Sequence, residues 1–274
     1  MKECETDTLL ERLRRAIGDQ RTMLVAFSGG VDSTLLLKVA HDLLGEKAAG
    51  LLAVSGSLPA SERREAEALA DWIGARCHIV ESREMEDPRY RANPDNRCYY
   101  CKSELFTLLE REAGRLGFAA LAYGANLDDQ GDFRPGMVAA GEHAVVAPLI
   151  EAGLGKSEIR ALARELGLPN WDKPARACLS SRIPHGVEVT PERLHAIETA
   201  EEGLYDLGFR LVRVRWHGEI ARIELGEEEI ARLADPAMRA RVADAVRAAG
   251  FRFVTLDLDG YRQGSLNPPL LTIE

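Results

Sequence analysis

The first half of the chain alternates between short apolar runs and longer stretches with apolar residues at helical spacing. Four of the apolar runs are typical of buried strands: 22–27, 50–54, 77–80 and 119–123. The stretches between them predict helices over 34–40, 60–75 and 100–116. Because strands and helices alternate regularly, we predict an α/β fold with a parallel, doubly wound sheet.

This alternating pattern ends near Gly167. The run 147–150 is expected to be another strand end, and a helix that Gly167 terminates is predicted over 157–166. The stretch 169–186 is too rich in proline and polar residues for a regular element. A long loop that also contains tryptophan, cysteine and arginines is expected to be functional.

A smaller unit with a different pattern follows. Thr190 and Pro191 are suited to the N-cap and the first position of a helix that extends to about residue 207. Half-buried strands and one charged helix complete the pattern, with strands predicted over 210–215, 220–225 and 251–257. We therefore expect an α/β domain over 1–168, a loop over 169–189 and a smaller α+β domain over 190–274.

Composition limits the classes of partner. The 274 residues are 46% hydrophobic, enough for a substantial core, and no stretch approaches the roughly 18 apolar residues of a membrane helix. The N-terminal residues lack the apolar core of a secretory signal, so we expect a cytoplasmic protein. A formal net charge of −9 makes nucleic acid an unfavourable partner and favours a small-molecule substrate.

A glycine loop directly follows the first predicted strand and consists of Ser28, Gly29, Gly30, Val31, Asp32 and Ser33. Adjacent glycines bring bare backbone N–H groups close to an anion, and the helix that follows adds the positive end of its dipole. The loop lacks the lysine of a Walker A motif, and Asp32 is better suited to hold Mg²⁺ against a leaving pyrophosphate. We interpret it as a phosphate-binding loop.

A second turn is expected beside this loop. Gly124 and the residues after it follow another predicted strand, and the carboxyl ends of parallel strands lie at the same edge of a sheet. Asn126 and Asp128 in this turn could contact a ligand or could equally be plain turn residues.

Three of the five cysteines are candidates for metal ligation. Cys98 and Cys101 form a Cys-x-x-Cys pair, and Cys178 lies in the second long loop. Zinc would require a fourth ligand, whereas an iron–sulfur cluster held by three cysteines leaves one iron open. A redox pair or a chance spacing is the alternative. Cys4, in an expected frayed terminus, and Cys77, in a buried strand, are predicted to have no role in the site.

Arginines form the last candidate group. Arg213 and Arg215 project from the same face of a predicted strand, and Arg182 follows the loop cysteine closely. Their guanidinium groups suit phosphate or carboxylate, although a solvated sheet face would explain Arg213 and Arg215 equally well. Glu201 is expected on a helix surface.

Together these motifs resemble known families. The segment 28–33 resembles the signature of the PP-loop ATP pyrophosphatases, which bind ATP and adenylate a substrate oxygen. With three further segments, 173–186, 213–215 and 256–267, the chain resembles the LarE family within that group. The likeness covers nearly the whole chain.

The resemblance implies an activity. LarE proteins are ATP-dependent sulfurtransferases that convert the carboxylates of pyridinium-3,5-biscarboxylic acid mononucleotide into thiocarboxylates, a step toward the nickel-pincer cofactor of lactate racemase. Cys178 matches the sulfur-bearing cysteine, which in one branch gives up its own sulfur. The additional Cys98 and Cys101 resemble the branch in which three cysteines hold a 4Fe-4S cluster, whose open iron carries hydrosulfide that sulfide or a sulfur donor replenishes.

The resemblance also implies roles for individual residues. Asp32, Ser28 and Ser33 would serve ATP and Mg²⁺. Arg213 and Arg215 would hold substrate phosphate or carboxylate. Arg182 would steady the loop that carries Cys178 (residues 169–189, called the cysteine loop below), and Glu201 matches a family carboxylate near the site. A homo-oligomer is expected. The main alternative is a PP-loop tRNA thiolase with an iron–sulfur cluster, but the acidic net charge and the specific C-terminal motif argue against it. A second alternative is a non-catalytic sensor of nucleotide or metal.

Overall fold

The computed structural model describes residues 2–129, 135–174 and 177–262. It divides into two compact units, of which the first comprises Met1–Glu86 and Asn96–Arg176 and the second comprises Asp87–Asp95 and Ala177–Glu274. Two of the motifs that carry the family resemblance fall partly outside the described residues, at 175–176 and 263–267.

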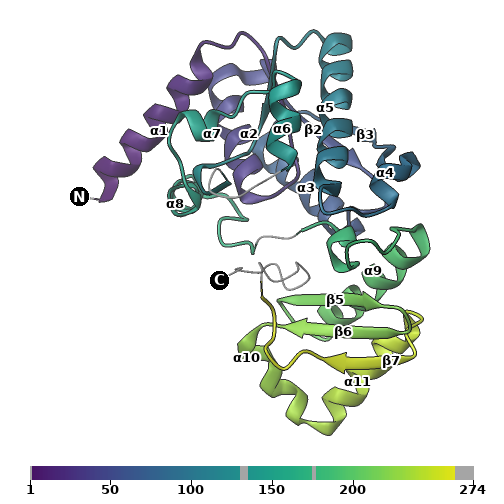
Figure 1. Cartoon of the computed structure of the whole chain (residues 1–274). Helices are drawn as coiled ribbons and strands as arrows, with labels where there is room; N and C mark the ends of the chain where they lie inside the picture. The colour runs from purple at the N-terminus through teal and green to yellow at the C-terminus, as the bar shows by residue number, and fades with distance from the viewer. Residues whose placement is uncertain (1, 130–134, 175–176, 263–274) are drawn as a thin grey trace, which may run out of the picture. The chain divides into compact units, whose positions relative to one another are not determined.

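The first unit is built on a four-stranded sheet with strand order β3-β2-β1-β4 (Figure 1). The strands are β1 (Met23–Ala26), β2 (Ala48–Val54), β3 (Cys77–Glu81) and β4 (Ala120–Tyr123). All three strand pairs are parallel, and Met23 lies opposite both Ala48 and Ala120. The predicted parallel α/β fold is therefore confirmed.

Helices cover both faces of this sheet. They are α1 (Lys2–Gly18), α2 (Val31–Leu44), α3 (Ala60–Ile73), α5 (Arg97–Leu116), α6 (Pro135–Glu142), α7 (Pro148–Glu151) and α8 (Lys156–Glu165). Met23 and Val25 of β1 belong to the core that includes Leu35 of α2. Leu24, which points to the opposite face, belongs to a second core with Phe106 of α5. The central strand is buried on both sides for this reason.

One helix of this unit was not predicted, and one local prediction was wrong. The helix that was not predicted is α1, whose Leu13 and Ile17 are fully buried. The run 147–150 was expected to end a strand, but Pro148 starts helix α7. Before this helix, the chain pairs with strand β4 only through an isolated bridge between Val146 and Ala122. Proline has no N–H group to donate to a β-ladder, whereas it fits the first turn of a helix.

The second unit contains the sheet β5-β6-β7, formed by Val212–His217, Ile220–Leu225 and Phe253–Leu256. Strands β5 and β6 are an antiparallel hairpin, and β7 is parallel to β6 because α11 (Pro236–Ala248) crosses between them. The helices α4 (Pro88–Arg91), α9 (Pro191–Asp206) and α10 (Glu227–Ile230) complete the unit (Figure 1). As predicted, Thr190 caps α9, with its side chain accepting a hydrogen bond from the Arg193 N–H. In neither unit do the described residues form a helix long and apolar enough to span a bilayer.

Candidate functional site

The glycine loop connects β1 to α2, as the sequence predicts. Gly29 has a φ of 71°, and a Cβ atom there would lie 2.8 Å from the Cβ of Ala66 on α3. Both the left-handed backbone and the close approach of α3 therefore require glycine. Gly30 is the N-cap of α2, and Val31 is its buried first residue.

Two serine hydroxyls hold the loop in shape. The Oγ atom of Ser33 accepts a hydrogen bond from the Ser28 N–H at 3.2 Å and donates to the Gly30 carbonyl at 3.1 Å. The two serine Oγ atoms lie 3.2 Å apart. These contacts tie the end of β1 to the first turn of α2, so the loop has a defined shape before any ligand binds.

Gly124 brings the end of β4 against this loop. A Cβ atom at Gly124 would lie only 2.8 Å from the backbone nitrogen of Ser33 and 3.1 Å from the carbonyl carbon of Asp32. No side chain fits there. The two turns therefore meet at the carboxyl edge of the sheet, as predicted.

The residues after Gly124 build a turn. Asn126 Oδ1 accepts a hydrogen bond from the Asp128 N–H at 3.0 Å, and Asp128 Oδ2 accepts one from the Lys156 N–H at 2.7 Å. Of the two roles left open for these side chains, the structure therefore supports the turn. Their contacts fix the start of α8.

Lys156, a residue that the sequence analysis missed, reaches the glycine loop. Its Nζ atom lies 2.5 Å from Oδ2 of Asp32, while Oδ1 of Asp32 is buried and has no hydrogen-bond partner among the described residues. Burial raises the pKa of Asp32, and the contact with Lys156 opposes that rise. The order Gly155-Lys156-Ser157 at a helix start is the sequence signal that could have identified this lysine.

Asn170 is a second residue that the sequence did not single out. Its Nδ2 atom donates to the Gly29 carbonyl and to Thr34 Oγ1, both at 3.0 Å. Nearby, Lys173 Nζ lies 2.8 Å from Glu62 and 2.6 Å from Glu65 of α3. The first residues of the cysteine loop are thus fastened to the glycine loop and to the helix beside it.

The candidate metal ligands are distributed over both units. Cys98 is exposed and Cys101 half-buried near the start of α5, and their spacing of three residues places them on one helix face. Cys178 lies in the second unit, half-buried, just before the turn 179–182. Within each unit, the described residues include no group of three or more histidine, cysteine or acidic side chains that could hold a metal.

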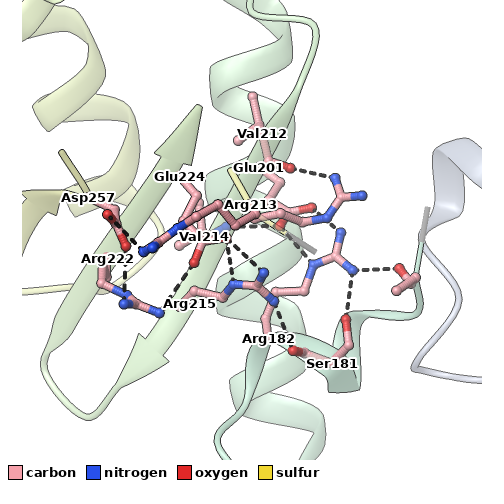
Figure 2. A network of polar contacts seen from close by, with 12 residues as sticks. Ser181, Arg182, Glu201, Val212, Arg213, Val214, Arg215, Arg222, Glu224 and Asp257 are labelled. Atoms are coloured by element: carbon pink, nitrogen blue, oxygen red, sulfur yellow. Dashed lines mark hydrogen bonds and ion pairs between the residues drawn. The ribbon is translucent and has the colours of Figure 1, made fainter. Parts of the chain in front are cut away.

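Arg182 links the backbone of Cys178 to helix α9, and Figure 2 shows its guanidinium group facing Glu201. Its Nε and Nη2 atoms donate to the two carboxylate oxygens of Glu201, each at 2.9 Å. Its Nη1 atom donates to the Cys178 carbonyl at 2.9 Å and also to the Ala177 carbonyl. Burial opposes the charge of Arg182, yet the facing Glu201 raises its pKa above the usual value.

Glu201 is buried, so its expected place on a helix surface was wrong. Only 4% of it is exposed, and its Oε1 atom also accepts a hydrogen bond from the Val214 N–H at 2.9 Å. This one carboxylate connects α9, strand β5 and the residues after Cys178. Helical periodicity places a charged residue on the surface. Glu201 is buried instead because a buried arginine supplies the opposite charge.

Arg213 and Arg215 are also buried, 2% and 5% exposed, which is not the solvated sheet face considered from the sequence. Arg215 donates through Nε and Nη2 to Glu224 Oε2 at 2.9 and 2.7 Å, and through Nη1 to the Ser181 carbonyl at 3.0 Å. Arg213 stacks on the ring of Tyr261 at 5.0 Å and donates to the Val212 carbonyl. Burial and the nearby charge of Arg182 lower the pKa of Arg213.

A chain of ion pairs continues across the sheet from Arg215 (Figure 2). Glu224 is fully buried and also accepts from Arg222 at 3.2 Å, and Arg222 lies 3.1 Å from Asp257 of the segment after β7. The guanidinium groups of Arg182, Arg213 and Arg215 are thereby held in defined orientations next to the cysteine loop. Glu201 pairs with Arg182 and Glu224 pairs with Arg215, so these two guanidinium charges are balanced within the unit.

A parallel α/β unit with a glycine loop after its first strand is typical of nucleotide-binding proteins. No family model matches the chain. It is 46% identical over 261 residues to an uncharacterized protein of Synechocystis sp., covering 95% of this chain and 97% of that protein. It is 26% identical over 173 residues to a subunit of the glutamine-hydrolyzing GMP synthase of Methanocaldococcus jannaschii, covering 60% of this chain and 56% of that subunit.

The more informative relative is the pyridinium-3,5-bisthiocarboxylic acid mononucleotide synthase of Lactiplantibacillus plantarum. The two sequences are 40% identical over 257 residues, which cover 93% of this chain and 92% of the synthase. The chain therefore belongs to the LarE family, of which this synthase is a member.

Proposed function

We propose that this chain is an ATP-dependent sulfurtransferase that converts pyridinium-3,5-biscarboxylic acid mononucleotide into its thiocarboxylate form for a nickel-pincer cofactor. The observation that carries the proposal is the 40% identity, over 93% of the chain, to a synthase named for that product. The glycine loop and the similarity to a GMP synthase subunit support the use of ATP and the assignment to the PP-loop pyrophosphatases.

The first step would be adenylation. A substrate carboxylate oxygen attacks the α-phosphorus of ATP, and the bond to pyrophosphate breaks with its electron pair on the leaving oxygen. The N–H groups at Gly29 and Gly30 and the start of α2 would hold the phosphates. Asp32 has one carboxylate oxygen without a partner among the described residues, which fits a ligand for Mg²⁺. Lys156 would neutralise charge that develops on the pyrophosphate.

The second step would be sulfur transfer. A sulfur nucleophile attacks the carbonyl carbon of the acyl adenylate, and AMP leaves with the electron pair of the broken C–O bond. Arg213 and Arg215 would bind the phosphate or the second carboxylate of the substrate. Arg182 and Glu201 would fix the backbone of Cys178 during this step.

We propose a 4Fe-4S cluster on Cys98, Cys101 and Cys178 as the source of sulfur. The donor set fits, because all three carry thiols that are not joined in disulfides and thiolates are the ligands of such clusters. When bound, a cluster with three protein ligands would supply a replaceable sulfur nucleophile at its open iron. The functional division into 1–168, 169–189 and 190–274, the cytoplasmic location and the homo-oligomer remain predictions from the sequence.

Anaerobic purification with iron and sulfide analysis tests the proposal. We expect about four irons per chain and a visible charge-transfer band, both lost in Cys98→Ala, Cys101→Ala and Cys178→Ala but retained in Cys77→Ala. With ATP, Mg²⁺ and substrate, the loaded protein should release pyrophosphate and give thiocarboxylate over several turnovers. An iron-free protein that turns over once and converts Cys178 to dehydroalanine would instead identify Cys178 as a sacrificial donor. Co-purified tRNA that becomes thiolated would overturn the substrate.

A further inference from the structure

Two serines and a glutamate form a polar cluster at the carboxyl edge of the sheet in the first unit. Ser55 and Ser57 follow the last residue of β2, and Glu84 opens the short helix Glu84–Glu86 that follows β3. The two strands remain paired up to this cluster, because the Val54 carbonyl accepts a hydrogen bond from the Ser82 N–H at 2.8 Å. All of these residues belong to the first unit, and the mechanism proposed above uses none of them.

Glu84 is the centre of the cluster. It is only 5% exposed, and its Oε1 atom accepts hydrogen bonds from the hydroxyls of Ser55 at 2.7 Å and Ser57 at 2.5 Å. Its Oε2 atom accepts none from the described residues, and no cation among them pairs with Glu84. A buried carboxylate is unfavourable when one oxygen has no donor and no opposite charge is near. The cluster therefore suits a ligand that donates hydrogen bonds.

This cluster lies close to the glycine loop. Strands β1 and β2 are parallel neighbours, and the Phe27 N–H donates to the Leu51 carbonyl at 2.8 Å, so the loop leaves the sheet beside the last residues of β2. Adjacent strands are about 4.8 Å apart. Residues 55–59 then lead into α3, whose Ala66 lies against Gly29. The connection that carries both serines thus borders the proposed phosphate site.

The direction in which a nucleotide would extend from the glycine loop follows from the strand order. Lys156, which is proposed to serve the pyrophosphate, is attached to the turn after β4 through Asp128. Strand β4 lies on one side of β1, and β2 and β3 lie on the other. The nucleoside would therefore extend toward β2 and β3. A single methylene group joins the ribose to the oxygen of the α-phosphate, so the ribose would come to lie near Glu84.

We propose that Glu84 binds the ribose hydroxyls of ATP through Oε2, with Ser55 and Ser57 fixing the orientation of its carboxylate. A carboxylate accepts hydrogen bonds only, and an acidic side chain binds ribose in this way in dinucleotide-binding α/β folds. Glu84 is then a specificity-determining residue that selects ribonucleotides over deoxyribonucleotides. This inference rests on the proposed function, because it assigns a partner to the nucleoside part of ATP.

The experiment is a calorimetric titration of the full chain, with Mg²⁺ and without the second substrate, using ATP, 2′-deoxy-ATP and 3′-deoxy-ATP. We expect the parent protein to bind ATP about tenfold more tightly than at least one deoxynucleotide, as for a hydrogen bond to a charged group. Glu84→Gln should weaken ATP binding at least fivefold but change the binding of that deoxynucleotide less than twofold. Glu86→Gln is the matched control, because Glu86 belongs to the same short helix and is exposed.

The outcomes separate this inference from the proposed function. Equal loss of affinity for all three nucleotides in Glu84→Gln would indicate a structural role and overturn the ribose contact. Equal affinity of the parent protein for all three would overturn it as well, while leaving ATP-dependent adenylation intact. Absence of ATP binding by the parent protein would overturn both. Circular dichroism reports whether Glu84→Gln is folded. If it is not, Ser57→Ala replaces it, with at least a twofold loss of the preference for ATP expected and no loss contradicting the contact.

Discussion

Cys77 and Cys98 differ in environment although both are free thiols. Burial, with Glu67 adding to it, raises the pKa of Cys77 to about 11, whereas Cys98 is exposed at the start of α5. Since the thiolate is the reactive form, iodoacetamide at pH 8 should label Cys98 at least about tenfold faster than Cys77 in metal-free protein. Quantitative peptide mass spectrometry measures both rates, with urea-unfolded protein as the control in which they converge. Equal rates in the folded chain would contradict the burial argument.

Lys156 is the residue whose contact with the glycine loop has the clearest chemical consequence. Its ammonium lies beside Asp32, where the leaving pyrophosphate is proposed to develop charge. Lys156→Ala should therefore lower the rate of pyrophosphate release by about 100-fold, as when other transition-state cations or donors are removed, with a partial recovery in Lys156→Arg. A coupled pyrophosphate assay measures the rate.

Lys38→Ala is a suitable control for that experiment, because Lys38 belongs to the same unit but pairs with Asp42 on the surface of α2. A normal rate in Lys156→Ala would remove Lys156 from the chemistry and leave it as a structural partner of Asp32.

The glycine loop could be predicted at the residue scale because its determinants are contiguous. Strand, glycines and helix start lie within a dozen residues, and each has a local conformational preference. Lys156 and Asn170 could not be found this way, because they contact the loop from 124 and 141 residues away. Their side chains have no local pattern, and only the tertiary fold brings them to the site.

At the scale of elements, Glu201 connects α9, β5 and the turn after Cys178. Removal of one partner from a buried ion pair leaves an uncompensated charge, so Glu201→Ala should reduce the free energy of unfolding by about 3 kcal/mol. The double variant Arg182→Met, Glu201→Leu should lose less than the single variant. Urea unfolding of the metal-free protein measures both. A loss below about 1 kcal/mol in Glu201→Ala would mean that water replaces the carboxylate.

Elements with a continuous apolar run or a clear N-cap were predicted well, and elements whose burial depends on partners from other segments were not. Strand β1 and helix α9 follow directly from an apolar run and an N-cap. Helix α1 was missed although Leu10, Leu13 and Ile17 are buried at helical spacing, because its first turns are polar. The buried face of β5 was the least predictable. Its Arg215 is paired with Glu224 of β6, and its Arg213 donates to the Val212 carbonyl, so both arginines depart from the rule that charges are exposed.

At the scale of the whole molecule, the three candidate thiols belong to both units. A cluster that binds them would bind the folded chain and not the unfolded chain, so iron loading should stabilise the protein. At a hundredfold excess over the dissociation constant the gain is about 2.7 kcal/mol, which corresponds to roughly 5–10 °C in Tm for a chain of this size. Anaerobic calorimetry of loaded and metal-free protein measures the shift.

The cysteine variants determine whether that stabilisation depends on both units. Cys77→Ala should show the full shift, because Cys77 lies in strand β3 with its thiol kept protonated by burial. Cys178→Ala should lose the shift as completely as Cys98→Ala, because a cluster held by the α5 thiols alone would lack its ligand from the second unit. If Cys178→Ala retained both iron and the full shift, the metal would bind only the first unit, and sulfur transfer from Cys178 itself would become the better explanation.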